Sequence, residues 1–316
     1  MSEYKKIHGI HVQALASDPS NLGAGQVWYN TTTNKLKITA VSTTGSWATG
    51  GNMATARYRL GGAGTQTAGL AFSGRDSSGN SNATEHYDGS AWTSGGNMAT
   101  ARSYPGSAGT QTAGLGFGGS PTTNVTEHYD GSAWTSGGNM GTGRSGMGSA
   151  GTQTAGLAFG GWDGSSTYHN ATEHYDGSSW TAGGNMGTAR DVMGSAGTQT
   201  AGLAFGGSTY SATEHYDGSA WTAGGNLGTG RKYLAGCGTQ TAGLAFGGRD
   251  NTNVTEHYDG SAWTAGGNLA TGRGYFAGAG TQAAGLAFGG DDVYEGSNTT
   301  EEYTGPGIIS KTVTSS

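Results

Sequence analysis

Residues 102–139 read RSYPGSAGTQTAGLGFGGSPTTNVTEHYDGSAWTSGGN, and variants of this stretch occur six times between Arg57 and Glu301. Each copy opens with an arginine, and successive arginines lie 41 to 46 residues apart. These arginines are Arg57, Arg102, Arg144, Arg190, Arg231 and Arg273. A fixed period of this length indicates a repeat architecture, in which each copy buries its apolar faces only by stacking against its neighbours.

The composition agrees with a packed repeat and restricts the function classes. Glycine fills 65 of the 316 positions, but it keeps a constant register with leucine, phenylalanine, tyrosine and tryptophan, which argues against disorder. Only 11% of the residues are charged and the net charge is −6, so we expect no basic surface for nucleic acid. We also expect no membrane insertion and no secretory signal peptide, because no apolar run is long enough for either.

The copy that begins at Arg102 predicts a sheet of four short antiparallel strands. The expected strands are residues 103–109, residues 111–119, residues 125–130 and a fourth strand that begins at residues 132–135. In the second strand, Leu115 and Phe117 fall on one face, whereas Gly114 and Gly116 fall on the other. The bulky face of one sheet is therefore expected to pack against the glycine face of another.

An Asp-Gly pair lies between the third and fourth expected strands, and Asp130-Gly131 is the example in the stretch quoted above. This pair is favoured in tight two-residue hairpins, where both central residues need a positive φ. The equivalent pairs are Asp88-Gly89, Asp176-Gly177, Asp217-Gly218 and Asp259-Gly260. The sequence therefore predicts a tight hairpin at this point of the copies.

The period and the four strands per copy predict a β-propeller, in which each copy is one blade. Within a copy, the landmarks are a Gly-Gly pair, a tyrosine on the third strand, a tryptophan and then the next arginine. The pairs begin at Gly118, Gly160, Gly206, Gly247 and Gly289, the tyrosines are Tyr87, Tyr129, Tyr175, Tyr216, Tyr258 and Tyr303, and the tryptophans are Trp92, Trp134, Trp180, Trp221 and Trp263. This order resembles the kelch repeat, although the first copy departs from it with Ser73-Gly74. The resemblance implies a kelch-like propeller.

The last copy ends in TEEYTGPG and has no tryptophan after Tyr303. Its missing fourth strand is most simply supplied by Ser46 and Trp47, which precede the first arginine. The expected fold is therefore all-β: a six-bladed kelch-like β-propeller with four antiparallel strands per blade, closed by a strand from the N-terminal side. Two alternatives stay open, because the stretch from Ile308 to Thr314 could take that place or form a seventh, degenerate blade with residues 26–40.

The expected domains are an N-terminal extension with a β-hairpin at residues 1–43, the propeller at residues 44–306 and a C-terminal tail at residues 307–316. Residues 26–38 predict the hairpin, since QVWYN and KLKI flank a polar TTTN turn. The stretch VQALASDPSNLGAGQVWYNTTTNKL, which ends at Leu36, resembles short segments of phage virion appendage proteins of the tail-fibre type. That resemblance implies a location on a virion or an extracellular face, with other virion proteins as partners of the extension.

Most of the repeated ionisable residues are interpreted as architecture. Six glutamates recur in register with the six arginines, and we expect each pair to form an ion pair or to bond to loop backbone. The glutamates are Glu85, Glu127, Glu173, Glu214, Glu256 and Glu301. Five histidines fall on third strands, where they are too far apart to share one metal ion with ligand distances of about 2.1 Å. They are His86, His128, His174, His215 and His257, and the sixth copy has Glu302 instead.

Two enzyme families use related scaffolds, and this chain lacks the signatures of both. Galactose oxidase of the kelch type needs a Cys–Tyr crosslink and copper-binding histidines, whereas Cys237, the single cysteine, stands where the other copies have alanine. Six-bladed sialidases carry an Asp-x-Gly-x-x-Trp turn and an arginine cluster, and the Asp-Gly-Ser-Ala-Trp spacing here departs from that turn. We therefore expect no enzymatic activity, no cofactor and no bound metal.

Comparison of the copies separates a constant end of the fold from a variable one. The GTQTAG and Asp-Gly turns hardly change, whereas the three residues after each arginine and the loops between the second and third strands vary. Alternation of strand direction places both variable regions at one end, and varied loops on a rigid scaffold are typical of binding sites. The candidate ligand-binding residues are Tyr58, Arg59, Tyr104, Trp162, Asp163, Tyr168, Tyr210, Lys232, Tyr233, Arg249, Asp250, Tyr275, Phe276 and Tyr294.

These candidates combine aromatic rings with carboxylate and guanidinium groups, which favours a polar ligand such as a sugar, or a protein surface. The sequence thus favours a non-enzymatic recognition module that binds a glycan or a host cell-surface receptor on a phage appendage. Two other classes fit the same residues. One is a structural virion spacer whose loops drifted after duplication, and the other is a glycan-active enzyme on a propeller scaffold.

Overall fold

The computed structural model describes residues 12–20, 23–208, 210–250, 252–291 and 296–313. The chain divides into two compact units, one formed by Met1–Gly45 with Pro306–Ser316 and the other by Ser46–Gly305. Regular structure in the described residues is all β-strand, and none of these residues forms a helix that could cross a membrane.

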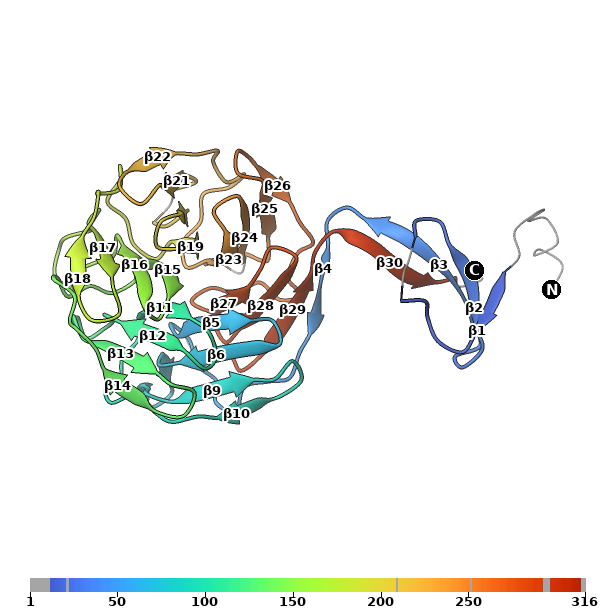
Figure 1. The fold of residues 1–316 in the computed structure, drawn as a ribbon, viewed down its shortest axis with the longest axis horizontal. Helices are drawn as coiled ribbons and strands as arrows, with labels where there is room; N and C mark the ends of the chain where they lie inside the picture. The colour runs from blue at the N-terminus through green and yellow to red at the C-terminus, as the bar shows by residue number, and fades with distance from the viewer. Residues whose placement is uncertain (1–11, 21–22, 209, 251, 292–295, 314–316) are drawn as a thin grey trace. The chain divides into compact units, whose positions relative to one another are not determined.

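The smaller unit contains one four-stranded sheet in the order β1-β2-β3-β30 (Figure 1). Its strands are β1 (Gln13–Leu15), β2 (Val27–Asn30), β3 (Lys35–Ser42) and β30 (Gly307–Thr312). The predicted hairpin is confirmed, with Val27 opposite Ile38. The C-terminal strand β30 pairs with β3, with Gly307 opposite Ser42, so the extension and the tail share this sheet. Of the expected stretch from Ile308, Thr314 lies outside the described residues.

The larger unit contains six four-stranded antiparallel sheets, which follow one another around a common centre in Figure 1. The first three sheets are β5 (Gly61–Thr65), β6 (Ala68–Phe72), β9 (Thr84–Tyr87) and β10 (Trp92–Ser94); β11 (Gly106–Gly109), β12 (Gly114–Phe117), β13 (Thr126–Tyr129) and β14 (Trp134–Ser136); and β15 (Gly148–Thr152), β16 (Ala155–Phe159), β17 (Thr172–Tyr175) and β18 (Trp180–Ala182). The other three are β19 (Gly194–Gly197), β20 (Gly202–Phe205), β21 (Thr213–Tyr216) and β22 (Trp221–Ala223); β23 (Ala235–Thr239), β24 (Ala242–Phe246), β25 (Thr255–Tyr258) and β26 (Trp263–Ala265); and β27 (Ala277–Gly280), β28 (Ala284–Phe288), β29 (Thr300–Thr304) and β4 (Ser46–Thr49). A two-stranded ribbon, β7 (Arg75–Asp76) and β8 (Gly79–Asn80), extends the loop after β6. The arrangement is consistent with a β-propeller.

The sixth sheet takes its fourth strand from the start of the larger unit. β4 pairs with β29, with Trp47 opposite Tyr303, as the sequence predicts. The Trp47 ring lies 4.9 Å from the Phe246 ring of the fifth sheet, and its Nε1 donates a hydrogen bond to Thr255 Oγ1 at 3.0 Å. Trp134, whose sheet is formed by continuous chain, makes the equivalent ring contact at 4.9 Å and the equivalent hydrogen bond at 2.9 Å. The strand from the N-terminal side therefore packs like the fourth strand of any other sheet.

The strands are shorter than the sequence predicts. In the second sheet, the strand expected over 103–109 begins only at Gly106. The reason is Tyr104, whose φ of 55° is a left-handed conformation that an extended strand cannot contain. The next strand ends at Phe117 because Gly118 also has a positive φ, of 60°.

The Asp-Gly pair forms a longer turn than the predicted two-residue hairpin. Between β13 and β14 the loop covers residues 130–133, and the Asp130 amide donates to the Ala133 carbonyl at 3.1 Å. Only the glycine has a positive φ, of 96° at Gly131. The Asp130 carboxylate explains the difference, because it accepts hydrogen bonds from the Ser132 and Ala133 amides, both at 2.8 Å.

Neighbouring sheets pack bulky face to glycine face, as predicted. A Cβ atom placed on Gly114 would lie 2.6 Å from Leu70 Cδ2 of the first sheet, and one placed on Gly116 would lie 2.8 Å from Phe72 Cε2. Both distances are well below the roughly 3.5–4.0 Å optimum for carbon atoms. The position of Gly114 is glycine in all six copies, whereas the position of Gly116 is alanine in the other five, so the close approach of the sheets requires glycine at the first position. Leu70 and Phe72 are fully buried, and burial of such side chains contributes about 1.5–3 kcal/mol each.

Glutamines in the constant GTQTAG turns join neighbouring sheets. The Gln111 side-chain amide donates to the carbonyls of Gly69 and Tyr87 in the first sheet, at 3.0 and 2.7 Å. Gln66 of the first sheet makes the same two bonds to the backbone of the sixth sheet, also at 3.0 and 2.7 Å. The equivalents between the other neighbours are Gln153, Gln199, Gln240 and Gln282. This turn stays constant because its side chain holds two sheets together.

Each repeat arginine is buried against the glutamate in register with it, as predicted, with N···O distances of 2.5 to 3.0 Å. Arg144 shows the pattern: it pairs with Glu173 at 2.6 Å and donates to the carbonyls of Gly160 and Ala171 at 2.7 and 2.8 Å. The second carboxylate oxygen of Glu173 accepts from the Gly141 amide at 2.7 Å. Burial lowers the pKa of the Arg144 guanidinium, and the charge of Glu173 acts in the opposite direction. The repeated charges therefore belong to the scaffold.

Candidate functional site

The second residue after each repeat arginine has a left-handed backbone conformation. The φ angles are 59° at Arg59, 55° at Tyr104, 63° at Gly146, 47° at Val192, 58° at Tyr233 and 59° at Tyr275. Positive φ is uncommon outside glycine, above all for a β-branched residue such as Val192. Strained backbone persists only where the surrounding structure holds it, and it clusters at functional sites.

A closed circle of backbone hydrogen bonds holds these six residues. In every case the N–H donates to the carbonyl oxygen of the equivalent residue that precedes it around the centre, at 2.5 to 3.1 Å. The Tyr104 amide donates to the Arg59 carbonyl at 2.7 Å, and the Arg59 amide donates to the Tyr275 carbonyl at 2.5 Å, which joins the first segment to the last. The circle brings six residues to one rim, five of them with a side chain, since the third is Gly146.

The rim surrounds a cavity of about 120 Å³, here called the central pocket. Its large rim side chains come from four different sheets and are Arg59, Tyr104, Tyr233 and Tyr275. Below the rim, the wall is apolar and consists of buried side chains that include Leu60, Met147, Met193, Leu234 and Phe276. Hydroxyl groups from three innermost strands complete it, and these belong to Ser107, Ser149 and Ser195. The pocket therefore combines an apolar wall with hydroxyl and guanidinium groups.

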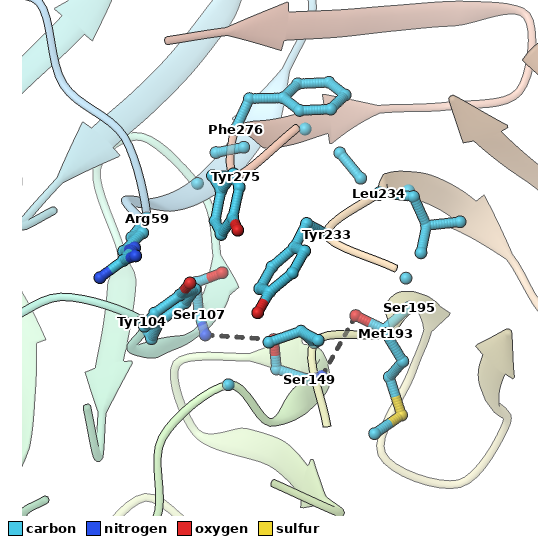
Figure 2. A pocket seen from close by; sticks show the side chains of 18 of the residues that line it. Arg59, Tyr104, Ser107, Ser149, Met193, Ser195, Tyr233, Leu234, Tyr275 and Phe276 are labelled. Carbon is cyan, nitrogen blue, oxygen red and sulfur yellow. Dashed lines mark hydrogen bonds between the residues drawn. The ribbon is translucent and has the colours of Figure 1, made fainter. Parts of the chain in front are cut away.

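The aromatic side chains of the rim form one cluster, shown in Figure 2. The Tyr233 and Tyr275 rings are stacked, with centroids 3.9 Å apart. Tyr104 lies 6.2 Å from the Tyr233 ring and 6.3 Å from the Tyr275 ring. The Arg59 guanidinium lies over two of these rings, 4.8 Å from Tyr104 and 5.3 Å from Tyr275. At such distances each ring attracts the cation, which orients the guanidinium in the pocket.

Arg59 is the single charged side chain among the described residues that line the central pocket. Within the described part of the chain, its side chain has no ion pair and no hydrogen bond, in contrast to the six repeat arginines. Burial raises the pKa of the Tyr104 phenol, and the charge of Arg59 opposes that shift. Tyr104 therefore stays a neutral hydroxyl at physiological pH, and the pocket carries a net positive charge.

The opposite end of the innermost strands is uniform by comparison. A second cavity, also of about 120 Å³, is lined there only by glycine, alanine, serine and Cys237. Cys237 is buried, and its burial raises the pKa of the thiol to about 12. Large and charged side chains thus gather at one end of the centre and not at the other.

The structure brings part of the sequence-predicted site together. Arg59, Tyr104, Tyr233, Tyr275 and Phe276 line the central pocket. Two further candidates adjoin it: Tyr58 is buried with its ring 5.1 Å from the Arg59 guanidinium, and Lys232 Nζ lies 5.7 Å from the Tyr233 ring.

The other candidates that the structure describes lie in the loops between second and third strands and do not line the pocket. The half-buried Trp162 pairs its backbone with Ser145 and Tyr168, and Tyr168 is 54% exposed. The Asp163 carboxylate accepts hydrogen bonds within its own loop, and those amides lower its pKa. The remaining loop candidates are Tyr210, which is 45% exposed, the neighbours Arg249 and Asp250, whose charged groups are 3.7 Å apart, and Tyr294, which lies outside the described residues.

Sequence reasoning missed the serines of the central pocket. Ser107, Ser149 and Ser195 each stand five residues after a repeat arginine, where the other three copies have glycine. The Ser107 amide donates to Ser149 Oγ at 3.1 Å, and the Ser149 amide donates to Ser195 Oγ at 3.2 Å, as Figure 2 shows. A comparison of the copies at this position would have identified them.

The third-strand histidines bind tyrosines. His86 Nε2 lies 2.7 Å from the Tyr129 hydroxyl of the next sheet. The equivalent pairs, at 2.6 or 2.7 Å, are His128–Tyr175, His174–Tyr216, His215–Tyr258 and His257–Tyr303. In the sixth sheet Glu302 accepts a hydrogen bond from the Tyr87 hydroxyl at 2.6 Å. Among the described residues, no three His, Cys, Asp or Glu side chains are grouped so as to hold a metal ion.

Comparison of the chain with protein-family models and with curated proteins gives no match.

Proposed function

We propose that the larger unit is a six-bladed kelch-like β-propeller that β4 closes into a ring. Three sets of contacts support this proposal, because each joins the first sheet to the sixth as it joins the other neighbours. They are the backbone bond from Arg59 to Tyr275, the Gln66 bonds, and the contact between the innermost strands β27 and β5. A ring of blades covers both faces of every sheet.

The function that we propose for this propeller is non-enzymatic recognition of a glycan or a cell-surface receptor at the central pocket. The observation that carries the proposal is the convergence of Arg59, Tyr104 and the stacked pair Tyr233–Tyr275 from four sheets on one cavity. Tyrosine offers a flat apolar face and a hydroxyl group, which together suit a sugar ring. The similarity of the N-terminal stretch to phage appendage proteins supports a role on a virion.

The size of the central pocket limits how much of a ligand can enter it. A cavity of roughly 150 Å³ accommodates benzene, and the central pocket is only slightly smaller, at about 120 Å³. A hexopyranose has about twice as many heavy atoms as benzene, so the ligand would place only one edge of a sugar ring in the pocket, with the rest of the molecule over the rim. Contacts with the outer loops, including Trp162, would then be secondary.

A glycan array on the full-length protein, followed by calorimetric titration of the best ligand, tests this function. Replacing Tyr233 with alanine should weaken binding by about 1–2 kcal/mol, or roughly 5- to 30-fold, since it removes an aromatic contact. Tyr168→Ala, which removes an exposed tyrosine outside the pocket, is the matched control and should leave the affinity unchanged. Loss of binding in Trp162→Ala but not in Tyr233→Ala would place the site in the loops. If the unmodified protein binds no glycan and no host cell, the result would favour the alternative function, a structural virion spacer.

A further inference from the structure

We infer that the central pocket selects a ring that carries a carboxylate, such as a hexuronic acid residue of a glycan. This inference rests on the proposed recognition function and adds the charge of the ligand to it. It starts from Arg59, whose guanidinium is held inside the cluster of tyrosines and has no acidic partner among the described residues.

The expected sign of the ligand's charge follows from the position of Arg59 among the tyrosine rings. Three phenol rings around one cavity would by themselves attract a cation. In this protein Arg59 takes that place, at 4.8 to 5.3 Å from the rings of Tyr58, Tyr104 and Tyr275. A cationic ligand would be repelled by Arg59, whereas an anionic group would gain an ion pair in a partly buried site, where such pairs are little screened by salt.

The hydrogen-bonding groups of the pocket also favour an acceptor. The described lining contains a guanidinium, three phenol groups and three serine hydroxyls but no carboxylate side chain. Ser149 Oγ and Ser195 Oγ each accept a bond from a backbone amide, which leaves their protons to be donated to a ligand. A carboxylate is acceptor-only and binds guanidinium groups in bidentate geometry.

The amount of charge distinguishes a carboxylate from a phosphate monoester. The lining carries one positive charge. Lys232 is not among the lining residues, and its Nζ lies 5.7 Å from the centroid of the Tyr233 ring. A carboxylate brings one negative charge, whereas a phosphate monoester brings about 1.5 to 2 at pH 7. One guanidinium neutralises the charge of a carboxylate, but it leaves part of the charge of a phosphate monoester uncompensated in a desolvated site.

The experiment compares four ligands by calorimetric titration of the full-length protein: glucuronic acid, its methyl ester, glucose and glucose 6-phosphate. Glucuronic acid should bind roughly 10- to 100-fold more tightly than the ester or glucose, as expected for a charge-assisted hydrogen bond. Because the ion pair would be partly buried, this preference should change little as salt is added. An oligosaccharide that ends in glucuronic acid shows whether the carboxylate ligand comes from a glycan terminus or from a free sugar acid. Binding as tight as that of the free acid identifies a glycan terminus, whereas binding of the free acid alone supports the carboxylate pocket but contradicts the glycan function.

Variants of Arg59 connect this selectivity to the pocket. Arg59→Gln should lower the affinity for glucuronic acid to that for glucose, and Arg59→Lys should retain part of the difference. The matched control is Arg75→Gln, which removes an exposed arginine of the β7–β8 ribbon, outside the pocket lining. Melting curves show whether each variant is folded. Equal affinity for glucuronic acid, ester and glucose at a pocket that Tyr233→Ala disables would overturn the inference and leave the recognition function intact. Tighter binding of glucose 6-phosphate than of glucuronic acid would also overturn the inference of a carboxylate ligand. If no saccharide binds, both this inference and the proposed recognition function are wrong.

Discussion

Replacement of Arg144 by alanine tests how much the repeated ion pairs contribute to stability. The guanidinium of Arg144 satisfies three acceptors, which are the carbonyls of Gly160 and Ala171 and one oxygen of Glu173, at 2.6 to 2.8 Å. The arginine is fully buried, and the Glu173 side chain is only 10% exposed. Removing one partner of a buried pair costs about 3–5 kcal/mol, because the other charge stays buried without compensation. For a unit of this size each kcal/mol lowers the Tm by roughly 2–4 °C, so we expect a decrease of roughly 6–20 °C.

The assay is thermal unfolding followed by calorimetry, with a double variant as the decisive comparison. Arg144→Met combined with Glu173→Met removes both charges and should destabilise the protein less than Arg144→Ala, because no charge is left unpaired. Arg75→Ala, at an exposed arginine, should change the stability by less than about 0.5 kcal/mol. A melting temperature of Arg144→Ala within about 1 °C of the unmodified protein would refute the reasoning. The reasoning would also be refuted if the loss of stability in the Arg144→Met, Glu173→Met double variant equals the sum of the losses in its two single variants.

Four further predictions concern the scaffold. Trp47→Ala and Trp134→Ala should cost the same, about 3–5 kcal/mol each by urea unfolding, because both rings make the same contacts; a much smaller loss at Trp47 would contradict closure by β4. Gly114→Val should prevent the approach of the first two sheets, since even a Cβ would lie 2.6 Å from Leu70 Cδ2, and soluble folded protein of normal Tm would show that the sheets can separate at no cost. Burial lowers the pKa of the five third-strand histidines, so below the ordinary histidine pKa of about 6.5 the unfolded chain binds more protons than the folded protein. The contribution of these histidines to stability should be complete above that pH and fall as the pH drops through their folded-state pKa values. A Tm that does not change between pH 7 and pH 5 would contradict this. Cys237, whose thiol pKa is raised to about 12, should react with a thiol reagent at pH 8 only after unfolding, and rapid labelling of the folded protein would count against its burial.

The repeated residues were the most predictable part of the fold. Pairing of Arg144 with Glu173, and packing of Gly114 against a bulky face, follow from residues that recur in every copy, because a role that depends on the scaffold must be the same in each. The Asp130 turn was predicted wrongly. The preference of Asp-Gly for tight hairpins considers the backbone alone, whereas here the carboxylate bonds to two amides and holds a longer loop. The late start of β11 was also hidden, since nothing in a tyrosine side chain signals the left-handed φ of Tyr104.

The candidate site was predictable as a set of segments but not as a pocket. Tyr233 and Tyr168 are both aromatic residues in variable regions, and the sequence treats them alike. In the structure, Tyr233 stands on the inner rim and lines the central pocket, whereas Tyr168 stands on an outer loop and is 54% exposed. Tyr233 and Tyr168 differ in their distance from the centre of the larger unit. The inner position of Tyr233 depends on the circle of backbone hydrogen bonds, which no residue pattern reveals. The serines were missed because small side chains in a glycine-rich strand resemble packing residues.

The pairing of strands at both limits of the larger unit has a consequence for how such a protein can evolve. Ser42 lies opposite Gly307 in one sheet, and Ser46 lies opposite Thr304 in another, so the chain enters and leaves the larger unit at adjacent points. In topology, the whole unit is an insertion at the tip of the hairpin formed by β3 and β30. Domains whose ends lie side by side are readily transplanted. Recombination at these two short junctions could therefore exchange one complete larger unit for another in a single event, while the sheet of the smaller unit stays unchanged.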